Sequence, residues 1–462
     1  MLLCSCAHSW LERDPSDALP IEDALETVED VDNALNAGYR TMLHHFYYGG
    51  TMLWLQDVRA NDMKTTALGM RTALEYQFQF SADNVATDLW TQPYILIKVA
   101  NTVIGQEANI AVDSEAQKQA LAQYIGEAHL LRALAHFDLV RLFASPYKKD
   151  NGQSSGVPIV AELLPPSATP GRSSVRDVYE FVLEDLEKAI DLMGPAKRNG
   201  RFNRFGAMAL MARVSLYQGD DSRALAYAEE IIASDQYSLM NPSDYLASWT
   251  SDYSSESIFE LAATAEVNAG GESMGYVMDP SNGYGAFHVS SSYHELLEEW
   301  PADIRKELLT VFEMGGSFNV VEKGLLGKYP GKEGAGYVAI NNHRLFQLAE
   351  VYLIAAEAAF KGGDAQASAS YLNTLIQARS PEAPSLVASD INEALIFRER
   401  RRELIGEGHS YFDALRDGKT LKRAHEGFFG QVEEIDWNDF RSILPIPRAE
   451  LNVNDLEQNP GY

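Results

Sequence analysis

Cysteine is almost absent from this sequence. Its 462 residues include two cysteines, Cys4 and Cys6, and none follows them. Two cysteines separated by one residue are too close for an ordinary disulfide, so we expect a fold without disulfides and without a thiolate metal site. Burial and hydrogen bonding must therefore hold the fold, and the chain is long enough to bury a large core.

Positive charge and long apolar runs are also scarce. The chain has 38 Lys and Arg against 66 Asp and Glu, a net charge of −28. This balance opposes nucleic-acid binding, which depends on neutralising phosphates. No continuous apolar stretch reaches the roughly 18 residues of a membrane-spanning helix. With 46% hydrophobic and 23% charged residues, the chain has an ordinary globular composition.

Motifs for catalysis and metal binding fail in their sequence context. Residues 271–275 match G-x-S-x-G, but a nucleophilic Ser273 would need a strand before it and a helix after it, and the following residues start a helix poorly. Residues 334–339 match a dinucleotide fingerprint but follow a Pro/Gly loop. His129 and His136 lie two turns apart without a third ligand, which favours a structural role. We predict a protein that is not an enzyme and has no cofactor or metal.

Apolar residues recur at helical spacing through most of the chain, which predicts a mostly α fold. The most highly charged helix is expected in Ile391–Lys419, ended by Gly406 and Gly408, with a second short helix over His409–Arg416. Its arginines are expected to brace the last repeat against the C-terminal tail. Other helices are predicted over residues 21–48, 89–104, 119–143 and 175–193.

Two pairs of helices share one design. Helices are predicted over 205–218 and 222–233, joined at Gly219-Asp220, and over 343–361 and 366–379, joined at Gly363-Asp364. Alanines inside both pairs permit close helix packing, as in tetratricopeptide units. Because the copies are irregularly spaced, we expect degenerate pairs with a long insertion and no uninterrupted solenoid.

The insertion, residues 241–342, is rich in Gly, Ser and aromatic residues. A strand is predicted over 257–262, a helix over 292–312 with an interruption at Pro301, and loop elsewhere. Long structured loops on a rigid scaffold commonly carry binding residues. We therefore expect this insertion to face the ligand.

Aromatic rings are the best candidates for ligand contact, because they stack on the apolar faces of sugars. Each ring could equally be a core residue. The candidates are Trp54, beside the Gly49-Gly50 break, and Tyr276, Tyr284 and Phe287 in the insertion.

The N-terminus has the pattern of a bacterial lipoprotein cleavage site. In Leu3-Cys4-Ser5-Cys6 an apolar residue and a small residue precede a cysteine, which predicts lipid attachment at Cys6. Residues 1–20 are then the anchor and tether, with the signal peptide truncated. The alternative is an accidental cysteine in an N-terminal tail.

Several motifs, in order along the chain, resemble the SusD/RagB family, surface lipoproteins of Bacteroidetes that capture nutrients for a TonB-dependent transporter. The most family-specific is the pair Glu399–Leu404 and Gly408–Asp413. The others are Leu3–Cys6 with the tether Leu11–Pro15, Gly126–Phe143, Gly156–Pro158, Arg344–Leu353 with Ala356–Ala358, and Leu444–Pro447 with Gln458–Tyr462.

The resemblance implies tetratricopeptide-like units and a non-catalytic protein held at the outer membrane by a lipid, facing outside. It divides the chain into a SusD-like N-terminal region, 21–240, and a RagB/SusD C-terminal region, 241–462. The expected partners are a glycan or oligosaccharide and a SusC-like transporter. Two alternatives stay open: capture of peptides, and a helical scaffold that binds proteins and no nutrient.

Overall fold

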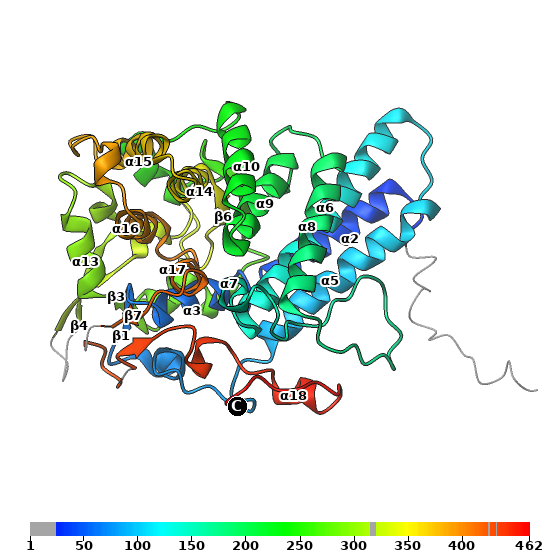
Figure 1. The fold of residues 1–462 in the computed structure, drawn as a ribbon, viewed down its shortest axis with the longest axis horizontal. Coiled ribbons are helices and arrows are strands. Elements are labelled where there is room, and N and C mark those ends of the chain that lie inside the picture. The colour runs from blue at the N-terminus through cyan, green and yellow to red at the C-terminus, as the bar shows by residue number, and fades with distance from the viewer. Residues whose placement is uncertain (1–24, 315–319, 424–425, 431) are drawn as a thin grey trace, which may run out of the picture.

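The computed structural model describes residues 25–314, 320–423, 426–430 and 432–462 (Figure 1). In this part of the chain helices dominate, and every sheet is a short antiparallel pair. The helices are α2 Val28–Met42, α3 Thr51–Arg59, α4 Ala73–Tyr76, α5 Asp88–Gln106, α6 Glu115–Phe143, α7 Tyr147–Asp150, α8 Val175–Leu192, α9 Arg204–Gln218, α10 Asp221–Ala233, α11 Pro242–Ala247, α12 Met274–Met278, α13 Ser291–Glu298, α14 Leu348–Lys361, α15 Ala365–Arg379, α16 Glu393–Leu404, α17 Ser410–Arg416 and α18 Arg448–Leu451. The strands are β1 Met63–Thr65, β2 Ser257–Leu261, β3 Phe287–Val289, β4 Thr310–Met314, β5 Val320–Gly324, β6 His343–Gln347, β7 Leu421–Lys422 and β8 Glu434–Ile435.

The two Gly-Asp turns form as predicted. Gly219 and Gly363 take left-handed conformations, with φ of 92° and 90°, which ends the preceding helix without steric cost. The side chains of Asp220 and Asp364 then accept hydrogen bonds from backbone N–H groups in the first turn of α10 and α15. One dipeptide therefore stops one helix and starts the next.

The helices form a continuous array in which each packs on its neighbour. Contacts run from α5 to α6, α8, α9, α10, α14 and α15, which lie in this order across Figure 1. Buried alanines let α10 and α14 approach closely, among them Ala224, Ala228 and Ala355. The prediction of a mostly α fold built from tetratricopeptide-like helix pairs is confirmed.

Two helix predictions in and beside the insertion need correction. Residues 343–347 form strand β6, and the helix begins only at Leu348, because this fully buried segment pairs with β2. In the segment predicted as helix over 292–312, α13 is followed by a 3-10 helix, η5 (Ile304–Leu308), and then by β4. Strand pairing overrides the local helical pattern in both cases: β6 pairs with β2, which is distant in sequence, and β4 pairs with the next strand, β5.

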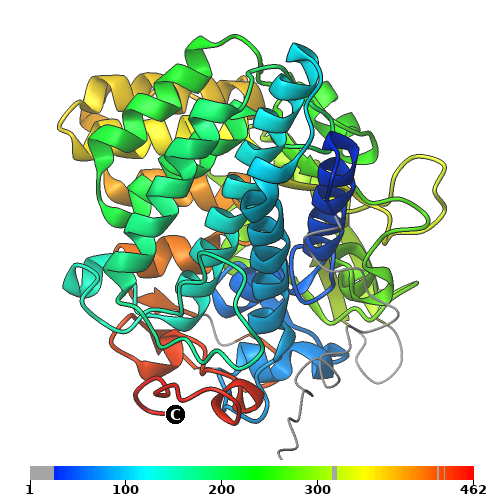
Figure 2. The same ribbon diagram turned by 90° about the vertical axis from the view of Figure 1, so that its right-hand side faces the viewer.

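Small sheets connect the insertion to the N-terminal region and to the segment that leads into α14. β2 pairs with β6, and β3 pairs with β1 from the N-terminal region. The C-terminal segment runs along the lower edge in Figures 1 and 2, where the Arg448 N–H donates to the Ala82 carbonyl. The division into 21–240 and 241–462 stays a prediction.

The buried charges of helix α16 are compensated by ion pairs. Glu403 receives hydrogen bonds from Arg379 of α15 and Arg305 of η5, at 2.9 and 3.0 Å, and all three side chains are at most 1% exposed. Arg402 donates to Glu399 Oε2 at 2.6 Å and to the Leu296 carbonyl of α13 at 3.0 Å. The arginines of α16 thus join the repeat helices to the insertion, and the predicted contact of this charged run with the C-terminal tail is made by α17, where Tyr411 Oη donates to the Ser442 carbonyl at 3.1 Å.

Candidate functional site

Three tyrosines of the insertion lie edge to face, and we call Tyr284, Tyr276 and Tyr337 the tyrosine row. The ring centroids of Tyr276 and Tyr284 are 5.2 Å apart, and those of Tyr276 and Tyr337 are 5.9 Å apart, both T-shaped. Tyr337 is 39% exposed, and the other two are half-buried. The row therefore offers aromatic surface at the edge of the molecule.

A tight turn sets the spacing of Tyr276 and Tyr284. The Tyr284 N–H donates to the Tyr276 carbonyl at 3.0 Å, and the Gly283 N–H donates to the Asp279 carbonyl at 3.0 Å. The Asp279 carboxylate accepts the Ser281 N–H at 2.8 Å. These bonds hold the turn as a closed unit, so the two rings keep one relative position.

An ion pair separates the tyrosine row from a cavity. The Arg71 guanidinium, from the 3-10 helix η1 (Gly69–Thr72), lies 3.8 Å from the Tyr284 ring centroid and 2.6 Å from Glu272 Oε1. Arg71, which is exposed, and Glu272, which is half-buried, lie at the rim of a cavity of about 200 Å³, which we call the α3 cavity. It is lined by His45, Phe46, Thr51, Trp54, Leu55, Arg71, Thr72, Glu75, Phe80, Ala86, Leu89, Glu272 and Val277.

The floor of the α3 cavity is helix α3. Every residue of α3 is buried, and Gly50, directly before the helix, lies so close to the Glu272 backbone that no side chain would fit. Gly50 therefore allows α3 to meet the insertion directly. The predicted break at Gly49-Gly50 positions Trp54 one turn into this helix.

Two lining residues carry polar atoms without partners. Trp54 is 7% exposed, and neither its Nε1 nor Glu75 Oε2 has a hydrogen-bond partner among the described residues. Burial raises the pKa of Glu75 to about 7, although the Arg59 guanidinium opposes the shift. Unpartnered buried polar atoms are costly, and both of these atoms belong to residues of the cavity wall.

The structure places the four candidate rings in three different environments. Tyr276 and Tyr284 lie together at the surface, and Trp54 forms part of the cavity wall. Phe287 is fully buried in β3, with its ring centroid 5.9 Å from that of Trp54. A ring with no exposed surface cannot touch a ligand, so Phe287 is corrected to a core residue.

Sequence reasoning missed Tyr337, Arg71, Glu75 and Glu272. Tyr337 follows two glycines in the same insertion, and this signal, used for Tyr284, could have included it. Arg71 and Glu272 meet across 201 positions of sequence. No local pattern joins them.

The serine and histidines of the catalytic and metal-binding motifs have structural roles. Ser273 is buried and caps α12, which a 3-10 helix, η4 (Gly270–Glu272), precedes in place of a strand. His129 Nδ1 lies 2.7 Å from Asp185 Oδ1, and His136 Nδ1 donates to the Arg132 carbonyl at 2.9 Å. Within the described residues, no cluster of His, Cys, Asp and Glu is arranged to hold a metal ion.

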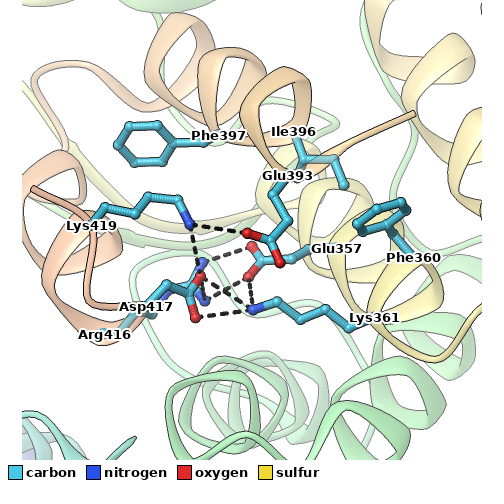
Figure 3. Close-up of a pocket in the computed structure, with 9 residues that line it drawn as sticks. All are labelled: Glu357, Phe360, Lys361, Glu393, Ile396, Phe397, Arg416, Asp417 and Lys419. Carbon is cyan, nitrogen blue, oxygen red and sulfur yellow. Dashed lines mark hydrogen bonds and ion pairs between the residues drawn. The ribbon is translucent and has the colours of Figure 1, made fainter. Parts of the chain in front are cut away.

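A second pocket, between α14, α16 and α17, is closed by its own charges (Figure 3). Lys361 Nζ lies 2.7 Å from Glu357 and 3.0 Å from Asp417, and Arg416 lies 2.6 Å from Glu357. Burial alone would raise the pKa of Asp417, but Arg416 and the neighbouring lysines hold it well below its usual range. With a volume of about 10 Å³, this pocket has room for roughly one water molecule. The charged cluster around it joins three helices.

A helical-repeat scaffold that carries an aromatic surface beside a cavity has the architecture of a ligand-binding protein. More specifically, the chain belongs to the SusD family, which is associated with the outer membrane. A family model described as "Starch-binding associating with outer membrane" matches residues 9–216, and the SusD family model matches residues 319–462. Helices of the described segments are too short or too polar to cross a membrane.

Known proteins resemble the chain over almost its whole length. A SusD superfamily protein of Bacteroides vulgatus is 34% identical with a TM-score of 0.88, over 95% of this chain and 100% of that chain. Surface glycan-binding protein A of Bacteroides fluxus is 25% identical with a TM-score of 0.77, over 95% of this chain and 100% of that chain. SusD-like protein P2 of Formosa agariphila is 26% identical, over 100% of this chain and 98% of its own.

Proposed function

We propose that this protein binds a glycan on the tyrosine row and delivers it, chemically unchanged, to a SusC-like TonB-dependent transporter in the outer membrane. The observation that carries the proposal is the row itself, which lies beside a cavity with unpartnered polar atoms. The starch-binding description of the matching family and the similar glycan-binding protein of Bacteroides fluxus support it.

Removing one ring is expected to weaken binding without preventing it. In a calorimetric titration with a panel of neutral oligosaccharides, Tyr284→Ala should raise the dissociation constant by roughly 2–12-fold, since a stacked ring contributes about 0.5–1.5 kcal/mol. Tyr227→Ala is the matched control, because Tyr227 is a half-buried tyrosine on the repeat helix α10. Saturable binding to peptides alone, or equal affinities for both variants, would contradict the proposal.

We also propose that lipid attached to Cys6 holds the chain at the cell surface. Cys6 lies outside the described residues, so the proposal rests on the sequence pattern and on the association of the family with the outer membrane. Labelled fatty acid should be incorporated into a precursor that carries a signal sequence and should be lost in Cys6→Ala. Label kept in that variant would place the lipid on Cys4 or rule out lipid attachment at this pattern.

The transporter partner is tested separately, by purification of the protein from detergent-solubilised membranes. Failure to copurify any barrel protein would favour the scaffold alternative.

A further inference from the structure

The α3 cavity is closed on the side away from its rim. Thr51, Trp54 and Leu55 line it from α3, a helix with no exposed residue, whereas at the rim Arg71 is exposed and Glu272 is half-buried. A ligand that enters past the ion pair therefore meets a buried helix and cannot continue in that direction. The cavity can hold the end of a chain and leaves the rest of that chain on the tyrosine row.

The size of the cavity fits a single ring. Its volume is about 200 Å³. A cavity of roughly 150 Å³ in a protein core holds one benzene molecule, and pockets for larger ligands measure roughly 300–1,000 Å³. One six-membered ring with its substituents is therefore the unit that this space admits.

The chemistry of the lining fits a sugar ring. Leu55, Phe80 and Leu89 supply apolar wall, and Trp54 Nε1 can donate one hydrogen bond. Glu75 Oε2 can accept one, or donate one when the carboxyl is protonated. A hexose has an apolar face, several donors and several acceptors, so its carbons can contact the wall. Its hydroxyls can pair with both atoms once the Trp54 and Glu75 side chains turn them toward the ligand, since both atoms are buried in this structure.

Arg71 lies between the cavity and the tyrosine row at the outer surface. Its guanidinium lies over the Tyr284 ring while pairing with Glu272, and Tyr276 and Tyr337 continue outward from Tyr284. Sugar rings stacked along the tyrosine row would bring the end of a glycan to the rim of the cavity. The ion pair already neutralises the Arg71 charge, which favours neutral sugars over acidic ones.

We propose that the α3 cavity binds the terminal sugar of a neutral oligosaccharide, so that the protein selects free chain ends over chain interiors. The inference rests on the proposed glycan binding and adds the part of the glycan that is recognised. Trp54 and Glu75 hold the terminal ring, and the tyrosine row holds the units that precede it.

The test compares free and end-blocked chains by titration calorimetry. The probes are maltohexaose, laminarihexaose, mannohexaose and xylohexaose, each also prepared with an aminobenzamide group at the reducing end and a bulky substituent on the terminal non-reducing hydroxyl. For the hexaose that binds, blocking both ends should lower the affinity at least tenfold. Singly blocked chains then identify which end enters.

Two conservative variants connect this discrimination to the cavity. Trp54→Phe removes the Nε1 donor and keeps a ring, and Glu75→Gln removes the charge and keeps the shape, so each should lower the affinity for the free hexaose by roughly threefold to tenfold. Tyr227→Phe on α10 is the control, and thermal unfolding checks the fold of each protein. Equal affinity for free and doubly blocked chains would overturn the inference and leave glycan binding in place. Absence of binding to every hexaose would overturn both.

Discussion

Glu403→Ala is expected to lower the free energy of unfolding by about 3–5 kcal/mol, the usual cost of breaking a buried ion pair. The Glu403 carboxylate lies between the guanidiniums of Arg379 and Arg305, none of them more than 1% exposed. Alanine would remove one buried counter-charge from both cations, leaving Arg379 with Glu256 alone and Arg305 with Asp303 and Glu399. Denaturant unfolding measured by circular dichroism tests the prediction.

Acid titration gives the same prediction a second readout. Burial alone would raise the pKa of Glu403, but Arg379 and Arg305 lower it from the ordinary 4.5 to about 2. The stabilisation is therefore complete above about pH 4.5 and is lost as the pH falls through 2. Glu403→Ala should lack this acid-dependent part of the unfolding free energy.

Control variants separate the charge from the shape. Glu403→Gln keeps hydrogen-bonding oxygen and volume, so it should fall between the wild type and alanine. Arg402→Ala, which breaks the bond to Glu399 on the same helix, should also lower stability. The folded fraction of every variant should bind glycan normally, because α16 contributes no residue to the α3 cavity or the tyrosine row. Wild-type stability in Glu403→Ala would contradict the role assigned to the network.

The repeat scaffold could be predicted from the sequence because the patterns that specify it are local. A Gly-Asp dipeptide carries both the left-handed stop and the cap of the next helix, as Gly219 and Asp220 show. Apolar periodicity similarly located α6 and α8. The strand at His343–Gln347 was missed because its partner, β2, lies far away in the sequence.

The candidate site could be predicted only in part from the sequence, because it too depends on contacts between residues far apart in the chain. Aromatic composition and glycines selected Tyr276 and Tyr284, whose rings lie side by side, but the same criterion selected Phe287, which pairing between β3 and β1 buries. Composition reports which rings are present, whereas exposure depends on strand pairing. The cavity joins α3, η1 and the insertion, so its polar residues could not be recognised before the fold was known.

Gly283→Ala is expected to reduce glycan affinity by roughly tenfold or more, because it should disturb two stacking contacts at once. A methyl group on Gly283 would overlap the Tyr276 carbonyl oxygen and come within 2.9 Å of the Asp279 carbonyl. Both are backbone atoms of the turn that spaces Tyr276 and Tyr284, so the turn must open to admit it. The two rings would then lose the relative position on which a stacked glycan depends.

Gly171→Ala is the matched control, since Gly171 is exposed and an added methyl group there meets no atom within 4 Å. Overpacking at Gly283 should cost about 1–3 kcal/mol of stability, less than the loss in Glu403→Ala, so the variant should remain folded under binding conditions. Affinity and stability then respond to different substitutions: the buried charges of α16 set stability, and the turn at Gly283 sets affinity. If Gly283→Ala binds the hexaoses as tightly as Gly171→Ala does, the geometry of the tyrosine row is not what holds the glycan.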